Sequence, residues 1–412
     1  MTWSEQTAAT APTTYDYGPP VQAPVDVRQA ASVVTGPAPT RPVRRSAGLT
    51  AVGILGIALL SLVALAVVAY LIAGLGPVAF GIGGIMALVP LAIVFVGVHW
   101  IDRWEPEPRG ILVFAFLWGA GASVAIALVV GVQLEGILAA LGSDETTSQF
   151  VAAVVQAPVV EEGAKGLGLL LIFWFARKHF DGPIDGLVYA AWVAGGFAFT
   201  ENILYFGVQL LTAGTVDGSL VEIFVARGVM SPFAHVMFTA FTGIALGFAA
   251  RRTSAVGAVG VFLLGLIPAM LLHGFWNGSL YFVSDFYVYY ALVQFPIFVA
   301  GVFVVLFLRR QEAKLTHDRL SEYAAVGWFN RDEINALATG AGRRRSQAWA
   351  NQRGVGRVMR HYTRDATRLA FTRQRLVTGR ASIGAEADEA GLLASIVASR
   401  AALAAAQAPR QL

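Results

Sequence analysis

Three charged residues, Glu161, Glu162 and Lys165, lie within the otherwise apolar segment VVEEGAKG (159–166). If this segment crosses a membrane, such groups are costly, and they usually face a protein interior or a watery cavity and take part in function. Lys165 follows the two acids by four and three residues, so on a helix it reaches both. It can neutralise one carboxylate and leave the other as a general base, and we predict that Lys165 holds Glu162 while Glu161 activates water. A purely structural ion pair between Glu162 and Lys165 is the alternative.

Further polar residues lie in later apolar segments: Glu201 with Asn202, His235, and His273 with Asn277. His273 and Asn277 are four residues apart and share a helix face, which suits two ligands of one ion or an imidazole with a substrate-orienting amide. Two imidazoles and a carboxylate match the ligand set of zinc, and a zinc-bound water beside a glutamate is a usual hydrolytic arrangement. We therefore predict a metal site of Glu201, His235 and His273. An oxyanion-stabilising site is the alternative.

Each of these residues also has a structural interpretation. Glu201 and Asn202 can cap a helix break, His235 can be a hydrogen-bonded core histidine, and His273 can join two helices. Arg227, the other basic residue inside an apolar segment, can simply extend to the membrane interface.

The composition indicates the elements that must position these groups. The 412 residues are 56% hydrophobic and 14% charged, with a mean hydropathy of +0.62, whereas soluble proteins are about 25% charged. The apolar blocks are long enough to span a bilayer as helices, and the absence of cysteine excludes disulfides and thiolate zinc sites. We predict an all-α polytopic bundle of about eight spans: 49–73, 77–99, 110–134, 150–176, 185–212, 222–249, 255–282 and 286–308.

Basic residues mark alternate connections between these spans, while the other connections carry only acids. Both termini are therefore expected in the cytoplasm. Counted from the predicted outer ends, Glu161, Glu201, His235 and His273 lie about 9–13 residues deep, or roughly 14–20 Å. Four separate spans thus place an acid or an imidazole at one level, nearer the outer face. A single shared site explains why these four residues lie at the same depth in the membrane.

Tails flank the predicted membrane domain, 47–310. Residues 1–46 are rich in Pro, Ala and Thr and are expected to be disordered. Residues 311–412 are basic and expected to be partly helical. The arginine-rich stretch 357–375 fits either a helix on anionic lipid or a solvated helix of a small domain.

Several motifs together resemble the PrsW family of intramembrane proteases, distant relatives of CAAX-processing and bacteriocin-immunity peptidases. EEGAK (161–165), FAFTEN (197–202), SPFAHVMF (231–238) and HGFWN (273–277) match its motifs in order, each on its own predicted span. DRWEPEP and DGLVYAA are also similar to family segments. The resemblance covers roughly residues 80–285.

This resemblance implies an enzyme of the cell membrane that hydrolyses a peptide bond of a membrane-anchored regulator such as an anti-sigma factor. It implies Glu161 and Glu162 as the essential acids, completed by Glu201, His235 and His273. Lys165, Asn202 and Asn277 are the expected supporting residues. We expect a membrane-anchored protein and the bilayer as partners, and no nucleic acid. A proton- or cation-coupled transporter and a non-catalytic membrane scaffold are the alternatives.

Overall fold

A computed structural model describes residues 47–103, 106–180, 182–252, 257–379 and 385–406 of the chain. Every regular element within these ranges is a helix, and none of them contains a strand. The chain divides near residue 312 into two compact units. The tail predicted to be disordered, 1–46, lies outside the described residues.

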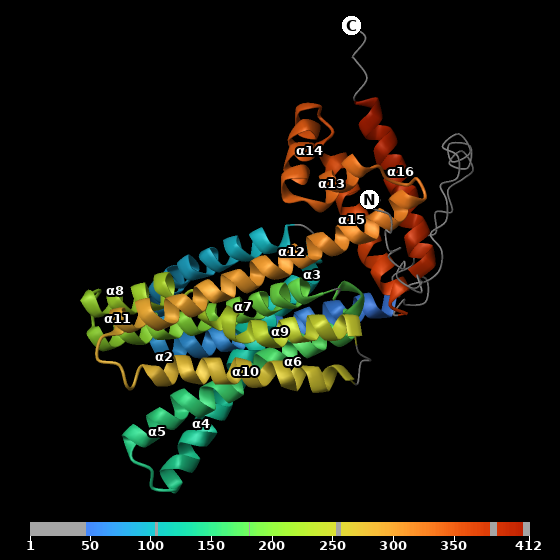
Figure 1. Cartoon of the computed structure of the whole chain (residues 1–412). Helices are drawn as coiled ribbons and strands as arrows, with labels where there is room; N and C mark the ends of the chain where they lie inside the picture. The colour runs from blue at the N-terminus through green and yellow to red at the C-terminus, as the bar shows by residue number, and fades with distance from the viewer. Residues whose placement is uncertain (1–46, 104–105, 181, 253–256, 380–384, 407–412) are drawn as a thin grey trace, which may run out of the picture. The chain divides into compact units, whose positions relative to one another are not determined.

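The first unit holds the membrane helices (Figure 1). Short π-helices, labelled η, interrupt several of them. In chain order the elements are α2 (Ala47–Asp102), α3 (Arg109–Leu117), η1 (Trp118–Ser123), α4 (Val124–Ala140), α5 (Glu145–Val151), η2 (Ala152–Gln156), α6 (Ala157–Phe175), the 3₁₀ turn η3 (Arg177–His179), α7 (Pro183–Ala213), α8 (Gly218–Phe224), η4 (Val225–Met230), α9 (Ala234–Arg252), α10 (Gly257–Ser279), α11 (Phe286–Tyr289), η5 (Tyr290–Gln294) and α12 (Phe295–Ala325).

Six helices of the described chain are long and apolar enough to cross a membrane. The first of them is two helices in succession, because Gly76 has φ 73° and ψ 160° and Pro77 follows it. Helix α6, which carries the three charged residues, is not among the six. The predicted all-α membrane bundle is therefore confirmed, whereas the count of eight crossings and their orientation remain predictions.

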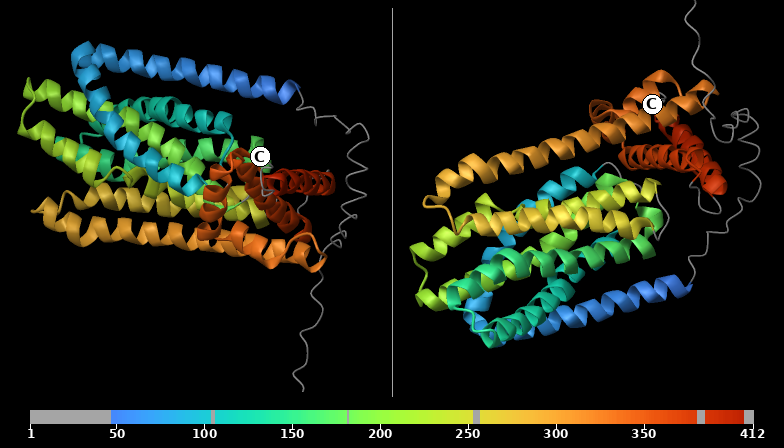
Figure 2. Two further views of the ribbon diagram at one scale, coloured as in Figure 1. Left: turned by 90° about the horizontal axis from the view of Figure 1, so that it is seen from above. Right: turned by 60° about the horizontal axis from the view of Figure 1, so that its bottom comes forward.

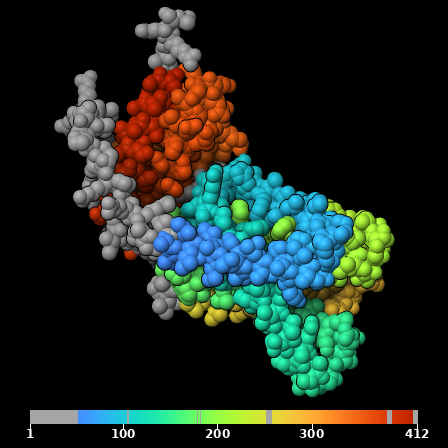
Figure 3. Space-filling model, turned by 180° about the vertical axis from the view of Figure 1, so that it is seen from behind, coloured from blue at the N-terminus to red at the C-terminus, as the bar shows by residue number. Residues whose placement is uncertain are grey.

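Helix α7 is the central helix of the bundle. About 72% of its apolar window is buried, against 11% for α2, and the first half of α2 runs along one face of the bundle (Figures 2 and 3). Glycines let the backbones of α7 and its neighbours approach closely. A Cβ on Gly186 of α7 would lie 1.9 Å from the carbonyl oxygen of Gly243 in α9, and a Cβ on Gly119 of η1 would lie 1.9 Å from that of Val193. Small residues at such contacts are typical of membrane helices.

Helices α4 and α5 form a hairpin that leaves the bundle (Figure 1). The hairpin is flanked by η1 and η2, where the wider helical turn interrupts the regular hydrogen-bond ladder. At its tip, the Asp144 side chain accepts a hydrogen bond of 3.0 Å from the backbone amide of Thr147, which caps α5. The path of the chain therefore departs from the bundle and returns to it immediately before α6.

The second unit includes four further helices, α13 (Arg331–Ala338), α14 (Gly340–Gln352), α15 (Gly356–Val377) and α16 (Ala385–Ala405). Helix α15 buries Tyr362, Leu369 and Ala370 in a separate apolar core. Asn330 and Glu333 form a reciprocal capping box at the start of α13. The arginine-rich stretch at 357–375 thus forms most of a helix that packs into this core, and its role as a helix on lipid or in a small domain remains a prediction.

Candidate active site

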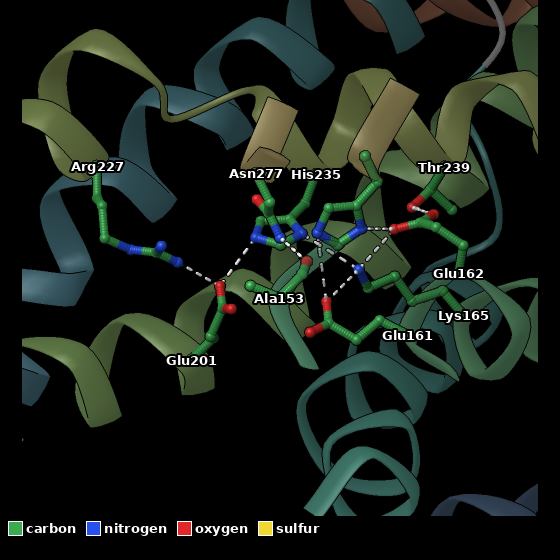
Figure 4. Close-up of polar contacts among 10 residues, drawn as sticks. Ala153, Glu161, Glu162, Lys165, Glu201, Arg227, His235, Thr239 and Asn277 are labelled. Carbon is green, nitrogen blue, oxygen red and sulfur yellow. Dashed lines mark hydrogen bonds and ion pairs between the residues drawn. The ribbon is translucent and has the colours of Figure 1, made fainter. Parts of the chain in front are cut away.

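The polar residues singled out in the sequence lie on four helices that meet inside the first unit (Figure 4). Helix α6 carries Glu161, Glu162 and Lys165, and α7 carries Glu201 and Asn202. Helix α9 carries His235 as its second residue, and α10 carries His273 and Asn277. Direct hydrogen bonds or ion pairs link Glu161, Glu162, Lys165, Glu201, His235 and His273 into one network.

Lys165 lies at the middle of this network and is fully buried. Its Nζ lies 3.2 Å from Glu161 Oε2, 2.8 Å from Glu162 Oε1 and 3.2 Å from His235 Nδ1. It also lies 3.9 Å from the centre of the Phe197 ring, within cation–π range. The ammonium group therefore joins two acids of its own helix to the histidine of α9.

Glu162 orients His273. Its Oε1 lies 3.2 Å from His273 Nδ1, and its Oε2 accepts a hydrogen bond of 2.8 Å from the Thr239 hydroxyl. A carboxylate can only accept, so this contact places the imidazole proton on Nδ1 and leaves Nε2 as a lone pair. Phe238 stacks on the His273 ring, with centroids 4.6 Å apart. The ring is therefore fixed in both position and tautomer.

Glu201 orients His235 in the same manner. Its Oε2 lies 2.8 Å from His235 Nε2. Because an ammonium can only donate, the contact of Lys165 with Nδ1 leaves that nitrogen as the acceptor and puts the ring proton on Nε2. His273 thus presents a free Nε2, whereas both ring nitrogens of His235 have a partner. A carboxylate that orients the imidazole is common for metal-binding histidines.

Arg227 does not simply extend to the interface. It pairs with Glu201, donates from Nε to Asn202 Oδ1 at 3.0 Å, and lies 3.8 Å from the centre of the Tyr205 ring. Asn202 therefore supports Glu201 through Arg227. Sequence reasoning missed this partner because Arg227 belongs to η4, whose wider turn changes the direction of its side chains.

Glu161, His235 and His273 form a group that can hold a metal ion. One donor atom from each lies within 4.8 Å of the other two, and His273 Nε2 lies 4.0 Å from Glu161 Oε2. The network contains three carboxylates, those of Glu161, Glu162 and Glu201. When ionised, they carry one more charge than the two basic side chains that pair with them, Lys165 and Arg227. Donor chemistry and charge both fit a divalent cation.

This metal-compatible group differs from the predicted one. The sequence interpretation assigned Glu201 to the metal and Glu161 to water activation, whereas the compact donor group contains Glu161 and not Glu201. Asn277 lies beside the group, where its Nδ2 donates to the carbonyl oxygen of Ala153 in η2 at 3.0 Å. It fixes α10 against the segment that precedes α6.

A cavity of about 180 Å³ opens onto these residues. Its lining includes Glu161, Glu201, His235 and His273, together with Arg227. Glu162 and Lys165 are not part of the lining and lie behind it, at 1% and 0% exposure. The cavity therefore meets two carboxylates and two imidazoles, the groups needed to bind and activate water beside a polar bond.

Comparisons with known proteins point to one family. The profile described as "PrsW family intramembrane metalloprotease" matches residues 107–302. "Protease PrsW" of Clostridioides difficile (strain 630) is 33% identical over 199 residues, which is 46% of this chain and 75% of the relative. "Protease PrsW" of Geobacillus kaustophilus (strain HTA426) is 33% identical over 149 residues, and that of Bacillus subtilis (strain 168) is 32% identical over 143. The chain spans 57% and 60% of these two relatives. No solved structure matches it.

Proposed function

Since this chain belongs to the PrsW family of intramembrane metalloproteases, we propose that its buried Glu–His network hydrolyses a peptide bond of a membrane-anchored protein. The chain is a multi-pass protein of the cell membrane. The observation that carries the proposal is the convergence of Glu161, Glu201, His235 and His273, from four helices, on one cavity. A regulator such as an anti-sigma factor is the proposed substrate class, on the resemblance of the motifs to those of the family.

We assign the metal to Glu161, His235 and His273, with zinc as the ion that suits a donor set of two nitrogens and one oxygen. Such an ion, when bound, polarises a carbonyl group and makes a bound water more acidic. Glu162 holds the proton of His273 on Nδ1, and Glu201 holds that of His235 on Nε2. The donor nitrogens would then be Nε2 of His273 and Nδ1 of His235, so Lys165, which donates to that Nδ1 here, would have to give up this contact when the ion binds. Lys165 keeps the two acids of α6 in place.

Glu201 is the carboxylate that lines the cavity outside the donor group, so we assign it the proton transfer. It accepts a proton from water as the water oxygen bonds to the peptide carbonyl carbon. It then passes that proton to the peptide nitrogen as the carbon–nitrogen bond breaks. Arg227, which also lines the cavity, keeps Glu201 in place and supplies positive charge near the developing oxyanion.

The experiment that tests this proposal measures zinc and cleavage in the same purified protein. Detergent-solubilised protein is incubated with a panel of peptides that match the membrane-anchored segments of regulators, and the products are identified by mass spectrometry. Removal of zinc with 1,10-phenanthroline should abolish cleavage, and added zinc should restore it.

Two variants complete this experiment. His273→Ala should lose both zinc and cleavage, because it removes a donor. Glu222→Gln, which changes an exposed carboxylate in α8, should keep both. Cleavage that persists in His273→Ala, or in zinc-free protein, would contradict the assigned chemistry. Uptake of ions into vesicles without any cleaved product would favour the transporter.

A further inference from the structure

Gln294 is a buried glutamine whose side-chain amide has no hydrogen-bond partner in the described part of the chain. It is 1% exposed, and both its Nε2 and its Oε1 are covered and unpaired. It also belongs to the lining of the cavity that holds Glu201, His235 and His273. An unpaired amide therefore borders the same cavity as the proposed catalytic groups.

Leaving such an amide unpaired has a definite cost. A buried donor or acceptor without a partner destabilises a protein by about 1–3 kcal/mol, whereas an apolar side chain of the same shape avoids that cost. Leucine has nearly the same volume and would suit the apolar segment around position 294. Because the unpaired amide of Gln294 borders the cavity, we take its hydrogen-bond partner to be a bound ligand that is absent from the protein alone.

The position of Gln294 in the backbone supports this interpretation. It is the last residue of η5, a π-helix that precedes α12, and π-helical turns often occur at functional sites because they redirect a side chain. The Tyr290 hydroxyl donates to the Met230 carbonyl at 2.7 Å and ties η5 to η4, the element that carries Arg227. Two π-helices thus stand side by side at this cavity, and each contributes one polar side chain.

We propose that Gln294 binds the main-chain N–H and C=O of one substrate residue and positions that residue in the cavity. A primary amide offers one acceptor and two donors, so it can pair at once with the N–H and the C=O of one residue in an extended main chain, which point to the same side. This pairing is independent of the substrate's side chains and requires that the segment be locally non-helical, since helical peptide groups are already paired. The inference rests on the proposed function, because it takes a polypeptide as the ligand.

The test combines thermal unfolding with peptide binding. The probe is a fluorescein-labelled apolar peptide of about 22 residues with Gly-Gly at its centre, and its anisotropy is read in detergent micelles with and without protein. Gln294→Leu should leave the melting temperature unchanged or raise it and weaken binding about five- to tenfold, as expected for one or two lost hydrogen bonds. Gln294→Met serves as a second variant should leucine not fit.

Thr242→Val is the matched control. Thr242 is 1% exposed, its hydroxyl is also buried without a partner, and it is absent from the cavity lining. This variant should likewise keep or raise the melting temperature, but binding of the peptide should not change.

A backbone-ester scan of the same peptide locates the bound group. An ester removes one N–H donor, so one ester position should weaken binding to the wild type severalfold and make no difference to Gln294→Leu. A lower melting temperature for both Gln294 variants would overturn the inference, because it would reveal a partner in the resting protein. Unchanged binding in both variants, or a wild type that does not bind the peptide, would overturn it as well. Gln294-dependent binding without cleavage would instead refute only the proposed function.

Discussion

Replacing Glu161 and Glu201 separately by glutamine should separate the metal donor from the proton acceptor. Both residues line the cavity, but only Glu161 has a carboxylate oxygen within the compact donor group. Glu161→Gln removes the one anionic donor of that group and should reduce bound zinc to less than about a tenth of the wild-type value after dialysis against a chelator. Glu201→Gln keeps the donor group and removes the negative charge that faces His235 Nε2 and Arg227.

The expected effect of Glu201→Gln on the metal follows from the contact with His235. Loss of a group that orients a metal-binding histidine weakens metal affinity about 10–100-fold. The variant should therefore remain fully loaded at micromolar zinc, while its affinity in a competition titration with a chromophoric chelator falls by that factor. Its cleavage should nevertheless be lost, because the proton acceptor is gone.

Zinc content by atomic absorption, together with that titration, decides between the two assignments. If Glu201→Gln empties the site while Glu161→Gln stays loaded, then the roles predicted from the sequence are right and those derived from the structure are wrong. If the wild type binds no zinc, the donor group does not act as a zinc site and the metal assignment is refuted.

Three further changes test the packing of the two units. Lys165→Met should destabilise the protein by about 3–5 kcal/mol, seen as a lower melting temperature, because it leaves buried carboxylates unpaired; an unchanged melting temperature would contradict the ion-pair network. Gly243→Ala should destabilise the protein by about 1–3 kcal/mol, because its Cβ would lie 2.1 Å from a carbonyl oxygen of α7. Gly260→Ala is the control and should not destabilise the protein, because no atom lies within 4 Å of its Cβ. Equal melting temperatures of the two variants would refute this close approach. Glu333→Gln should weaken the ion pair with Arg400 by about 0.2–1 kcal/mol and make the second unit more sensitive to an added protease. Equal digestion rates of the variant and the wild type would show that this ion pair does not stabilise the second unit.

Much of the site could be predicted from the sequence because depth in a membrane is readable from helical rise. Glu161, Glu201, His235 and His273 were expected at one level, and the structure brings them around one cavity. Depth fixes position along a helix but not the direction of a side chain around it. For that reason the sequence could not separate Glu161 from Glu201 as the third donor, since both lie at the right level.

The residues that sequence reasoning missed lie where the helices depart from regular geometry. Arg227 and Gln294 both belong to π-helices, and no regular helical periodicity predicts where such side chains point. The sequence still offered one indication for Gln294, because a single amide side chain in an otherwise apolar segment is a candidate functional residue. The fold was more predictable, because long apolar blocks require helices in a bilayer.

The backbone contacts between α7 and its neighbours determine which parts of the protein can move. Gly186 and Gly243 place two carbonyl groups where no side chain fits, so α7 and α9 cannot rotate past each other without a clash. These two helices carry Glu201 and His235, and they form the rigid side of the site. Helix α12 is different, because only 11% of its apolar window is buried. We expect a polypeptide to enter the cavity by displacement of this outer span, which contributes Phe286 and Gln294 to the lining, while Glu201 and His235 keep their positions.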